Sequence, residues 1–251
     1  MRSALEQLVL PAECVLCHAL LPFPRADDLI CPVCRHRWRP VVPPWCERCG
    51  QPEPLFGRCR MCHDWPEALR LVRTAVWLDP AARRAVHTLK YGGISRLADD
   101  LAEAVARVPL PPAERARAVL VPVPLGPRRL RTRGYNQSER LARALAHRWG
   151  RPVVELLVRA RETATQTALT PAARLANVAG AFAMRNAECG MRNAAISQHS
   201  AFRISHSTLV LVDDVFTTGA TLAAAARALE DAGARSIMAV TFGRAVIPDF
   251  T

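Results

Sequence analysis

The sequence predicts an α/β protein in which a parallel-sheet domain follows a small metal-binding module. Four Cys-x-x-Cys pairs stand within residues 14–62, and from about residue 67 onwards strand-like and helix-like segments alternate. Such alternation is typical of a parallel sheet with helices on its faces. The chain has 251 residues, 50% of them hydrophobic and 22% charged, which suffices for one large or two modest domains. This composition excludes collagen, coiled coil and wholesale disorder.

The cysteine pairs have the spacing of two consecutive zinc ribbons. Short loops over 18–30, 35–45 and 50–58 separate the pairs, and two pairs together supply the four thiolates of a tetrahedral site. A sequential pairing is simplest, although an interleaved one uses the same ligands. Neighbouring His18, His36 and His63 are alternative ligands, and we favour surface positions for them. The predicted zinc ligands are Cys14, Cys17, Cys31, Cys34, Cys46, Cys49, Cys59 and Cys62.

These zinc sites are expected to be structural, because four thiolates leave no open position for water. A disulfide framework is disfavoured, since the N-terminus lacks the features of a signal peptide. A thioredoxin-type redox motif is disfavoured because no strand-to-helix context precedes the pairs. So small and proline-rich a module needs metal to fold. We place it at 1–66, with the second domain at 67–251.

The first half of the second domain opens with a strand predicted over 70–78. Asp79 and Pro80 are an N-cap and first-turn signal for a helix that ends near Gly92. A helix over 96–107, a buried strand over 118–124 and a helix over 136–149 follow. The last of these carries apolar residues four positions apart.

The second half continues with a strand over 153–158 and a strongly apolar strand over 208–214 that ends in two acids. An alanine-rich helix over 220–232, stopped by Gly233, and a strand over 236–242 complete the pattern. The segment 185–207 is less patterned and predicts a surface insertion that contains Cys189.

The segment 210–221 reads V-L-V-D-D-V-F-T-T-G-A-T and carries the most informative chemistry. Its glycine and threonines allow backbone N–H groups and hydroxyls to surround one phosphate at a helix N-terminus. Asp213 and Asp214 would repel that phosphate, but they suit the vicinal hydroxyls of a sugar that carries it. The segment therefore predicts a site for a ribose 5-phosphate group, whereas a helix-capping turn is the less favoured alternative.

This segment resembles the phosphoribosyl pyrophosphate (PRPP) signature of type I phosphoribosyltransferases. With the cysteine module in front, the chain resembles the ComF family, which joins a double zinc ribbon to a phosphoribosyltransferase-like domain. Three further segments carry the resemblance: LKYGG at 89–93, VPVPLGPRRLRTRGYNQSERLARAL at 121–145 and RARETATQTALTPAARLANVAGAF at 159–182.

The resemblance implies a role for each matching position. Asp213 and Asp214 would hold ribose hydroxyls, and magnesium would be bound largely by oxygens of PRPP itself. Residues of a flexible loop over 159–177, Thr165 and Gln166 among them, would close over the site. The implied 5-phosphate ligands are Thr217, Thr218, Gly219, Ala220 and Thr221. The implied pyrophosphate loop consists of Val123, Pro124 and Leu125, with Arg128, Arg129, Arg131 and Arg133 as nearby charges.

The charge balance favours an anionic partner. The chain has 34 basic and 22 acidic residues, a formal net charge of +12, which suits nucleic acid, nucleotide phosphates or pyrophosphate. A merely solvated basic surface is the alternative. No apolar run reaches the length of a membrane span, and we expect a cytoplasmic protein.

Two functions follow from the resemblance. The first is a ComF-like protein that binds PRPP or a related ribose phosphate and acts in DNA uptake during natural competence. Its candidate partners are single-stranded DNA and competence or recombination proteins. The alternative is an active, magnesium-dependent phosphoribosyltransferase that transfers phosphoribosyl from PRPP to a nitrogen acceptor and releases pyrophosphate.

Overall fold

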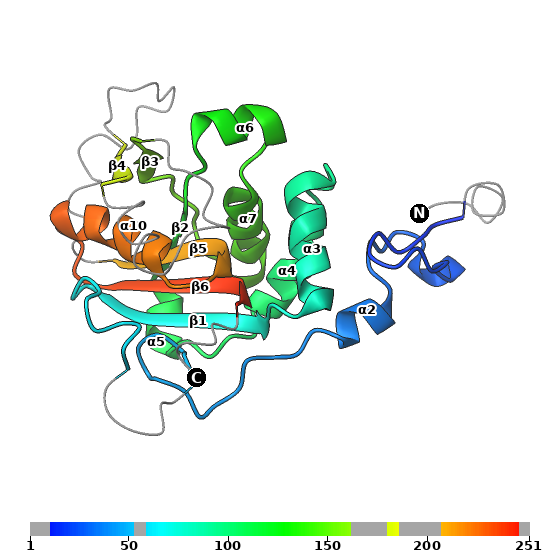
Figure 1. Ribbon diagram of the computed structural model, residues 1–251, viewed down its shortest axis with the longest axis horizontal. Coiled ribbons are helices and arrows are strands. Elements are labelled where there is room, and N and C mark those ends of the chain that lie inside the picture. The colour runs from blue at the N-terminus through cyan, green and yellow to red at the C-terminus, as the bar shows by residue number, and fades with distance from the viewer. Residues whose placement is uncertain (1–10, 53–58, 162–179, 186–206, 246–251) are drawn as a thin grey trace.

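The computed structural model describes residues 11–52, 59–161, 180–185 and 207–245. Its core is a parallel four-stranded sheet (Figure 1). The elements described, in chain order, are η1 Phe23–Arg25, α2 Pro32–His36, β1 Leu69–Trp77, α3 Pro80–Tyr91, α4 Leu97–Val105, α5 Pro112–Ala116, β2 Ala118–Pro122, α6 Pro127–Arg133, α7 Gln137–Trp149, β3 Leu157–Arg159, β4 Phe182–Met184, β5 Thr208–Phe216, α10 Ala220–Asp231 and β6 Ile237–Arg244.

The sheet has the strand order β1-β6-β5-β2, and every neighbouring pair is parallel. The predicted α/β class is therefore confirmed. Asp79 caps α3 as predicted, because its carboxylate accepts from the backbone N–H groups of Ala81 and Ala82 at 2.9 Å. None of the helices described is both long and apolar enough to span a bilayer.

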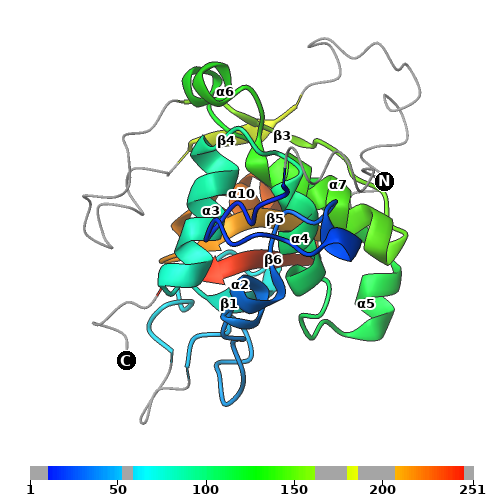
Figure 2. The same ribbon diagram turned by 90° about the vertical axis from the view of Figure 1, so that its right-hand side faces the viewer.

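Helices cover both faces of the sheet. Figure 2 shows α3 and α4 in front of the sheet and α10 behind it. Alternate residues of β5 point to opposite faces: Val210 and Val212 belong to one buried apolar cluster, Leu209 and Leu211 to the other. We call these the α4-side core and the α10-side core. Burial on both faces explains why the sequence of β5 is continuously apolar.

The β1 edge of the sheet is covered by an earlier segment of the chain. Beside β1, Val41 N–H donates to the Ala75 carbonyl at 3.1 Å and Trp77 N–H to the Arg39 carbonyl at 2.8 Å. The segment between the two cysteine clusters thus lies along the β1 edge, which shields it from pairing with other chains.

The strand predicted over 153–158 is present only in part. Val153 forms a single parallel bridge with Leu120, after which the chain leaves the β2 edge and forms β3, which pairs antiparallel with β4. Pro152 contributes only its carbonyl, which accepts from Leu120 N–H at 2.9 Å. It has no N–H for a longer ladder.

Other differences concern short elements. The sequence reasoning did not identify α5, α6 or β4, and β5 continues through both acids to Phe216. Apart from its two end residues, the segment 185–207 predicted as an insertion lies outside the described residues, as does Cys189. The domain boundary at residue 66 stays a prediction.

Candidate functional site

The candidate site lies where β2 and β5 end side by side. The helix α7 follows β2 and packs on the α4-side core, whereas α10 follows β5 and belongs to the α10-side core. The chain therefore leaves these two neighbouring strands towards opposite faces of the sheet. In open parallel sheets, this reversal forms a crevice at the carboxyl ends of the strands, where ligands bind.

The turn after β5 has the form expected of an anion site. Gly219 adopts a left-handed conformation, with φ at +77°, and is the N-cap residue of α10. Ala220 N–H donates to the Thr218 hydroxyl at 3.5 Å. Thr218 is buried, while Thr217 and Thr221 are half-buried. The N-terminus of α10 thus has backbone N–H groups and hydroxyls in one place, an arrangement suited to phosphate.

Asp213 and Asp214 lie near the end of β5, and both are buried. The Asp213 carboxylate accepts from the Ser138 hydroxyl at 2.7 Å and from Asp214 N–H at 2.9 Å. Gln137 amide donates to Asp214 at 3.4 Å. The first turn of α7 therefore holds both carboxylates in place.

Lys90, the only lysine of the chain, forms an ion pair with Asp214. Its side chain is 23% exposed, against 5% for Asp214. Lys90 was identified from the sequence only within the LKYGG segment at 89–93, so this partner was not predicted. Gln137 and Ser138 lie in a segment whose sequence indicates helix capping as well as a candidate site, but their contacts with the two acids were not predicted.

Burial and the ion pair have opposite effects on the two acids. Burial, reinforced by the charge of Asp214, raises the pKa of Asp213 well above its ordinary value. Burial also acts to raise the pKa of Asp214, but the Lys90 ammonium outweighs it and the net pKa is lowered. One carboxyl is thus biased towards the neutral form and its neighbour towards the anion, so together they can both donate to and accept from sugar hydroxyls.

The loop after β2 lies beside this pair. Val123 N–H donates to the Val212 carbonyl at 3.0 Å, and the Asn136 side-chain amide donates to the Val123 carbonyl at 3.0 Å. Asn136 also caps α7, accepting from Ser138 N–H at 3.1 Å. Val123 is buried, and Pro124 and Leu125 are half-buried. Asn136 therefore joins the predicted pyrophosphate loop to the helix that holds the acids.

The arginines after this loop form the short helix α6, which the sequence reasoning described only as a cluster of charges. Arg128 and Arg131 are exposed, while Arg129 and Arg133 are half-buried. The Arg133 guanidinium lies over the exposed ring of Tyr91, 5.1 Å from its centroid. Thr165 and Gln166 of the predicted closing loop lie outside the described residues.

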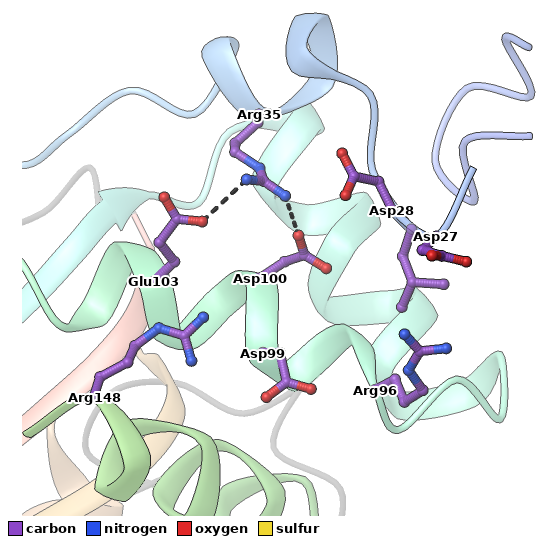
Figure 3. A pocket seen from close by; sticks show the side chains of 9 residues that line it. Asp27, Asp28, Arg35, Arg96, Asp99, Asp100, Glu103 and Arg148 are labelled. Carbon is purple, nitrogen blue, oxygen red and sulfur yellow. Dashed lines mark hydrogen bonds and ion pairs between the residues drawn. The ribbon is translucent and has the colours of Figure 1, made fainter. Parts of the chain in front are cut away.

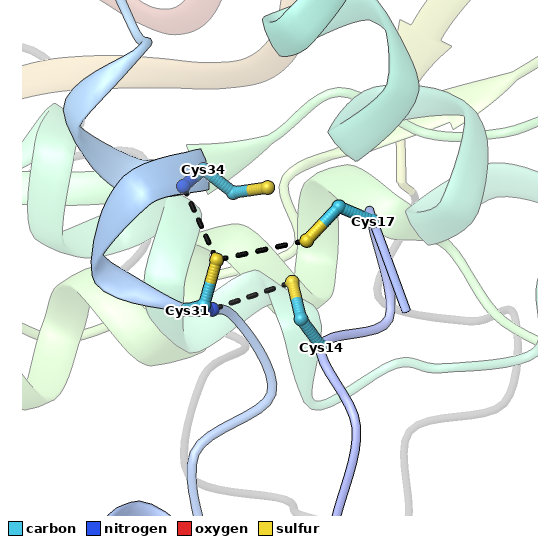
Figure 4. Close-up of side chains that lie close together, drawn as sticks. All are labelled: Cys14, Cys17, Cys31 and Cys34. Carbon is cyan, nitrogen blue, oxygen red and sulfur yellow. Dashed lines mark hydrogen bonds between the residues drawn. The ribbon is translucent and has the colours of Figure 1, made fainter. Parts of the chain in front are cut away.

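The eight paired cysteines form two separate clusters, each composed of sequential pairs. Within each cluster, the four sulfur atoms lie within 4.8 Å of one another. Figure 4 shows the first cluster, Cys14, Cys17, Cys31 and Cys34, with their sulfurs facing a common centre. The second comprises Cys46, Cys49, Cys59 and Cys62. We call the described segments around them ribbon 1 (residues 11–38) and ribbon 2 (residues 45–52 and 59–66).

The sulfur geometry fits zinc. Four sulfurs about 2.3 Å from one zinc ion define a tetrahedron with edges of about 3.8 Å. The Cys17–Cys31 and Cys46–Cys62 sulfur pairs are 3.7 Å apart, and Cys49–Cys59 is 3.5 Å. Backbone N–H groups also point at the sulfurs, as that of Cys31 does at Cys14 Sγ at 3.3 Å. Two four-cysteine sites of this kind suit structural zinc ribbons.

A separate pocket lies between ribbon 1 and α4. Figure 3 shows Arg35 of α2 reaching over α4, where it donates to Glu103 at 3.0 Å and pairs with Asp100. Asp27, Asp28 and Arg148 also line this pocket. It contains none of the residues predicted for PRPP. Its central charges are already paired, so we read it as the contact through which ribbon 1 docks.

Comparison with known proteins agrees with this architecture. A double zinc ribbon domain matches residues 5–64, and a phosphoribosyl transferase domain matches residues 132–245. The chain is 32% identical over 238 residues to the DNA utilization protein YhgH of Salmonella typhimurium, covering 92% of this chain and 96% of that protein.

Two further relatives are similar over most of their length. The DNA utilization protein YhgH of Escherichia coli K12 is 30% identical over 246 residues, 92% of this chain and 96% of that protein. The competence protein ComFC of Bacillus subtilis is 26% identical over 231 residues, 88% of this chain and 86% of that protein. The cysteine clusters, the parallel sheet and these relatives agree: the chain belongs to the ComF family, in which a double zinc ribbon precedes a phosphoribosyltransferase domain.

Proposed function

We propose that this protein binds PRPP, or a related ribose 5-phosphate, at the carboxyl ends of β2 and β5, and that it acts in DNA uptake. The observation that carries the proposal is the adjacency of two unlike groups. A turn suited to phosphate, at Gly219, follows directly after two buried carboxylates, Asp213 and Asp214. A ligand that satisfies both has an anionic end and vicinal hydroxyls.

The ligand is placed as follows. Its 5-phosphate accepts hydrogen bonds from the turn 217–221 at the N-terminus of α10, and its ribose hydroxyls face Asp213 and Asp214. Its pyrophosphate lies along Val123, Pro124 and Leu125, with Arg128 and Arg129 as counter-charges. Magnesium would be held by oxygens of the ligand, and it would offset the charge of the pyrophosphate beside the acids.

Lys90 supports this placement. A carboxylate buried without a partner is costly, and Lys90 keeps Asp214 in the ionised form that accepts hydrogen bonds from hydroxyls. Because the lysine side chain is 23% exposed, we expect its ammonium to be able to contact an incoming anion. Lys90 thus stabilises the charge of Asp214 before the ligand binds and can contact the ligand's anionic group afterwards.

Calorimetric titration with PRPP and magnesium tests the proposal. The double variant Asp213→Asn with Asp214→Asn is expected to lose binding, because amides remove both the charge and half of the acceptor capacity. A matched control is Asp27→Asn with Asp28→Asn, another pair of adjacent acids, in ribbon 1. No heat of binding by the unaltered protein at millimolar PRPP would refute the proposal, as would equal binding by both double variants.

The role in DNA uptake is supported by the names of the relatives, which include "DNA utilization protein" and "Competence protein". The net charge of +12 and the arginines of α6 suit the phosphates of single-stranded DNA. Retention of single strands is expected to fall as salt rises. It is expected to weaken in Arg128→Ala with Arg131→Ala but not in the control Arg83→Ala with Arg84→Ala, an exposed pair on α3. Retention unaffected by salt would contradict this role.

Phosphoribosyl transfer is the second candidate, favoured by the match to a phosphoribosyl transferase domain at 132–245. In that reaction, the bond between the anomeric carbon and pyrophosphate breaks as a nitrogen nucleophile attacks. The electron pair leaves with pyrophosphate, and the nitrogen loses its proton. Release of pyrophosphate with any member of a panel of nucleobases and amines would support transfer. Release that persists in the double Asp213/Asp214 variant would exclude this site as its origin.

A further inference from the structure

Ribbon 2 touches the candidate phosphate turn through Trp65. This residue stands three positions after the zinc ligand Cys62 and is 7% exposed. A Cβ atom at Gly219 would lie 2.4 Å from Cζ2 of Trp65 and 3.1 Å from its Cε2. The indole also packs edge-on against Phe216, with ring centroids 6.1 Å apart. The tryptophan therefore lies directly against the backbone of the turn.

Trp65 is itself held in place by Arg48, from the first half of ribbon 2. The Arg48 guanidinium donates to four backbone carbonyls on both sides of the tryptophan. Their distances are 2.9 Å to Cys62, 3.2 Å to Trp65, 2.7 Å to Pro66 and 3.0 Å to Leu69. One side chain thus fixes the path of the chain from the metal cluster to the start of β1.

A second arginine connects the ribbon to the sheet from the opposite direction. Arg244, the last residue of β6, is 1% exposed, and its guanidinium donates to the Cys49 carbonyl at 2.9 Å and to the Gln51 side chain at 2.8 Å. The same guanidinium lies 4.1 Å from the centroid of Phe216. Phe216 directly precedes the turn, so Trp65 and Arg244 contact this ring together.

We infer that ribbon 2 lines one side of the ligand site, and that Trp65 is a positioning residue that holds the turn 217–219 in its anion-binding conformation. The inference rests on the proposed function. A left-handed residue followed by a helix start is one of several conformations that an isolated T-T-G-A segment can adopt. Contact with the Trp65 indole, which Arg48 holds in place, favours this one conformation before the ligand binds. Binding then loses less conformational entropy in the turn.

Ribbon 1 supplies a matched control. Trp38 is also 7% exposed and packs edge-on against an aromatic residue of the sheet, Phe242, with centroids 4.9 Å apart. It belongs to the α4-side core, whereas Trp65 and Phe216 belong to the α10-side core beside the turn. Truncation of either tryptophan removes a similar amount of buried surface, but only one truncation opens space beside Gly219.

The test compares Trp65→Ala, Trp65→Phe and Trp38→Ala in the full zinc-loaded chain. Urea unfolding is expected to show similar losses of stability for the two alanine variants. Hydrogen exchange of the amides at 217–222 is expected to rise by at least about tenfold in Trp65→Ala and to stay unchanged in Trp38→Ala. PRPP affinity is expected to fall by at least about tenfold in Trp65→Ala alone, with partial recovery in Trp65→Phe.

Each outcome decides a different point. Exchange at 217–222 that rises equally in Trp65→Ala and Trp38→Ala, or in neither, would overturn the positioning role. If Trp65→Ala fails to fold, Trp65→Phe provides the same comparison, since its smaller ring leaves a gap at Gly219. If the unaltered protein does not bind PRPP, the proposed function fails, and the exchange measurement still determines whether Trp65 holds the turn.

Discussion

The two ribbons share a metal motif but make different contacts with the sheet. Ribbon 1 adds Cys14, Cys31 and Cys34 to the α4-side core, and it reaches α4 through Arg35, whose side chain is 34% exposed. Ribbon 2 adds Cys49, Met61 and Cys62 to the α10-side core, and it bonds to the sheet through Arg244, which is almost fully buried. Two modules with the same four cysteine ligands therefore contact the sheet in different ways.

The difference has a physical origin. Partly exposed ion pairs such as Arg35 with Glu103 are screened by water and contribute little to stability. Buried guanidinium groups bonded to backbone carbonyls must keep their partners, because an unpaired buried group is costly. We therefore expect ribbon 2 to be bound more rigidly than ribbon 1. It is also the ribbon that contacts the candidate phosphate turn.

The largest expected effect comes from removing one zinc ligand from each ribbon. Cys34→Ser and Cys49→Ser both replace buried cysteines, and each variant is expected to bind about one zinc ion fewer and to lose several kcal/mol of stability. PRPP binding should be lost only in Cys49→Ser, because only ribbon 2 supports the turn. Zinc content by mass spectrometry and calorimetry with PRPP check this, and equal loss of PRPP binding in both variants would erase the distinction between the ribbons.

The docking arginines provide the second comparison. Arg244→Met removes the guanidinium that donates to the Cys49 carbonyl and to the Gln51 side chain, so we expect a loss of about 3 kcal/mol in the free energy of unfolding. Arg35→Met removes two partly exposed ion pairs, to Asp100 and to Glu103, and should cost less, about 1 kcal/mol. Urea unfolding at low and high salt measures both. A larger loss for Arg35→Met would reverse the assignment of rigidity.

The third comparison concerns Gly219 and its contact with Trp65 of ribbon 2. Gly219→Ala places a methyl group 2.4 Å from Trp65 at a residue with φ of +77°, and strain of this kind costs about 2 kcal/mol. Adding Trp65→Ala removes the clash but leaves the backbone strain, so the double variant should cost less than the sum of the two single variants. Strict additivity in urea unfolding would show that Trp65 does not press on the turn.

Much of the fold followed from local signals. The α/β alternation, the cap at Asp79 and the two zinc ribbons all depend on residues close together in the chain. The contacts of Lys90 with Asp214, and of Trp65 with Gly219, join residues more than a hundred positions apart. No periodicity or capping rule reports such contacts. Their nearest sequence signals were a solitary lysine and a tryptophan beside a metal ligand.

The site predictions divide in the same way. The turn 217–221 and the acids were found from one short motif, because a phosphate turn needs its glycine, hydroxyls and helix start in sequence. Arg128 and Arg129 were identified as charges, but the helix α6 that carries them was not, since its seven residues lack a clear apolar period. Binding of PRPP and magnesium, and a cytoplasmic location, stay predictions.

The smallest expected effect concerns pH and ribbon 1. Burial raises the pKa of Asp100 even though Arg35 beside it acts to lower it, and the charges of Asp28 and Glu103 add to the rise. Between the ordinary pKa, near 4, and the raised value, the folded protein keeps a proton that the unfolded chain has lost. Stability should therefore fall as pH rises through this window.

Asp100→Asn should remove that contribution, so the difference in unfolding free energy between Asp100→Asn and the unaltered protein should change with pH by less than about 1 kcal/mol. Asp213, whose pKa is also raised, is present in both proteins. Its contribution therefore cancels in the difference between their unfolding free energies. By contrast, the hydrogen bonds of Arg48 and Arg244 that attach ribbon 2 go to carbonyl, amide and sulfur acceptors, which do not titrate in this range. Urea unfolding between pH 4 and 6 makes the measurement. If the unaltered protein instead gains stability relative to Asp100→Asn as pH rises, the attraction of Arg35 dominates over burial at Asp100. Ribbon 1 would then be anchored more firmly by charge than the exposure of Arg35 implies.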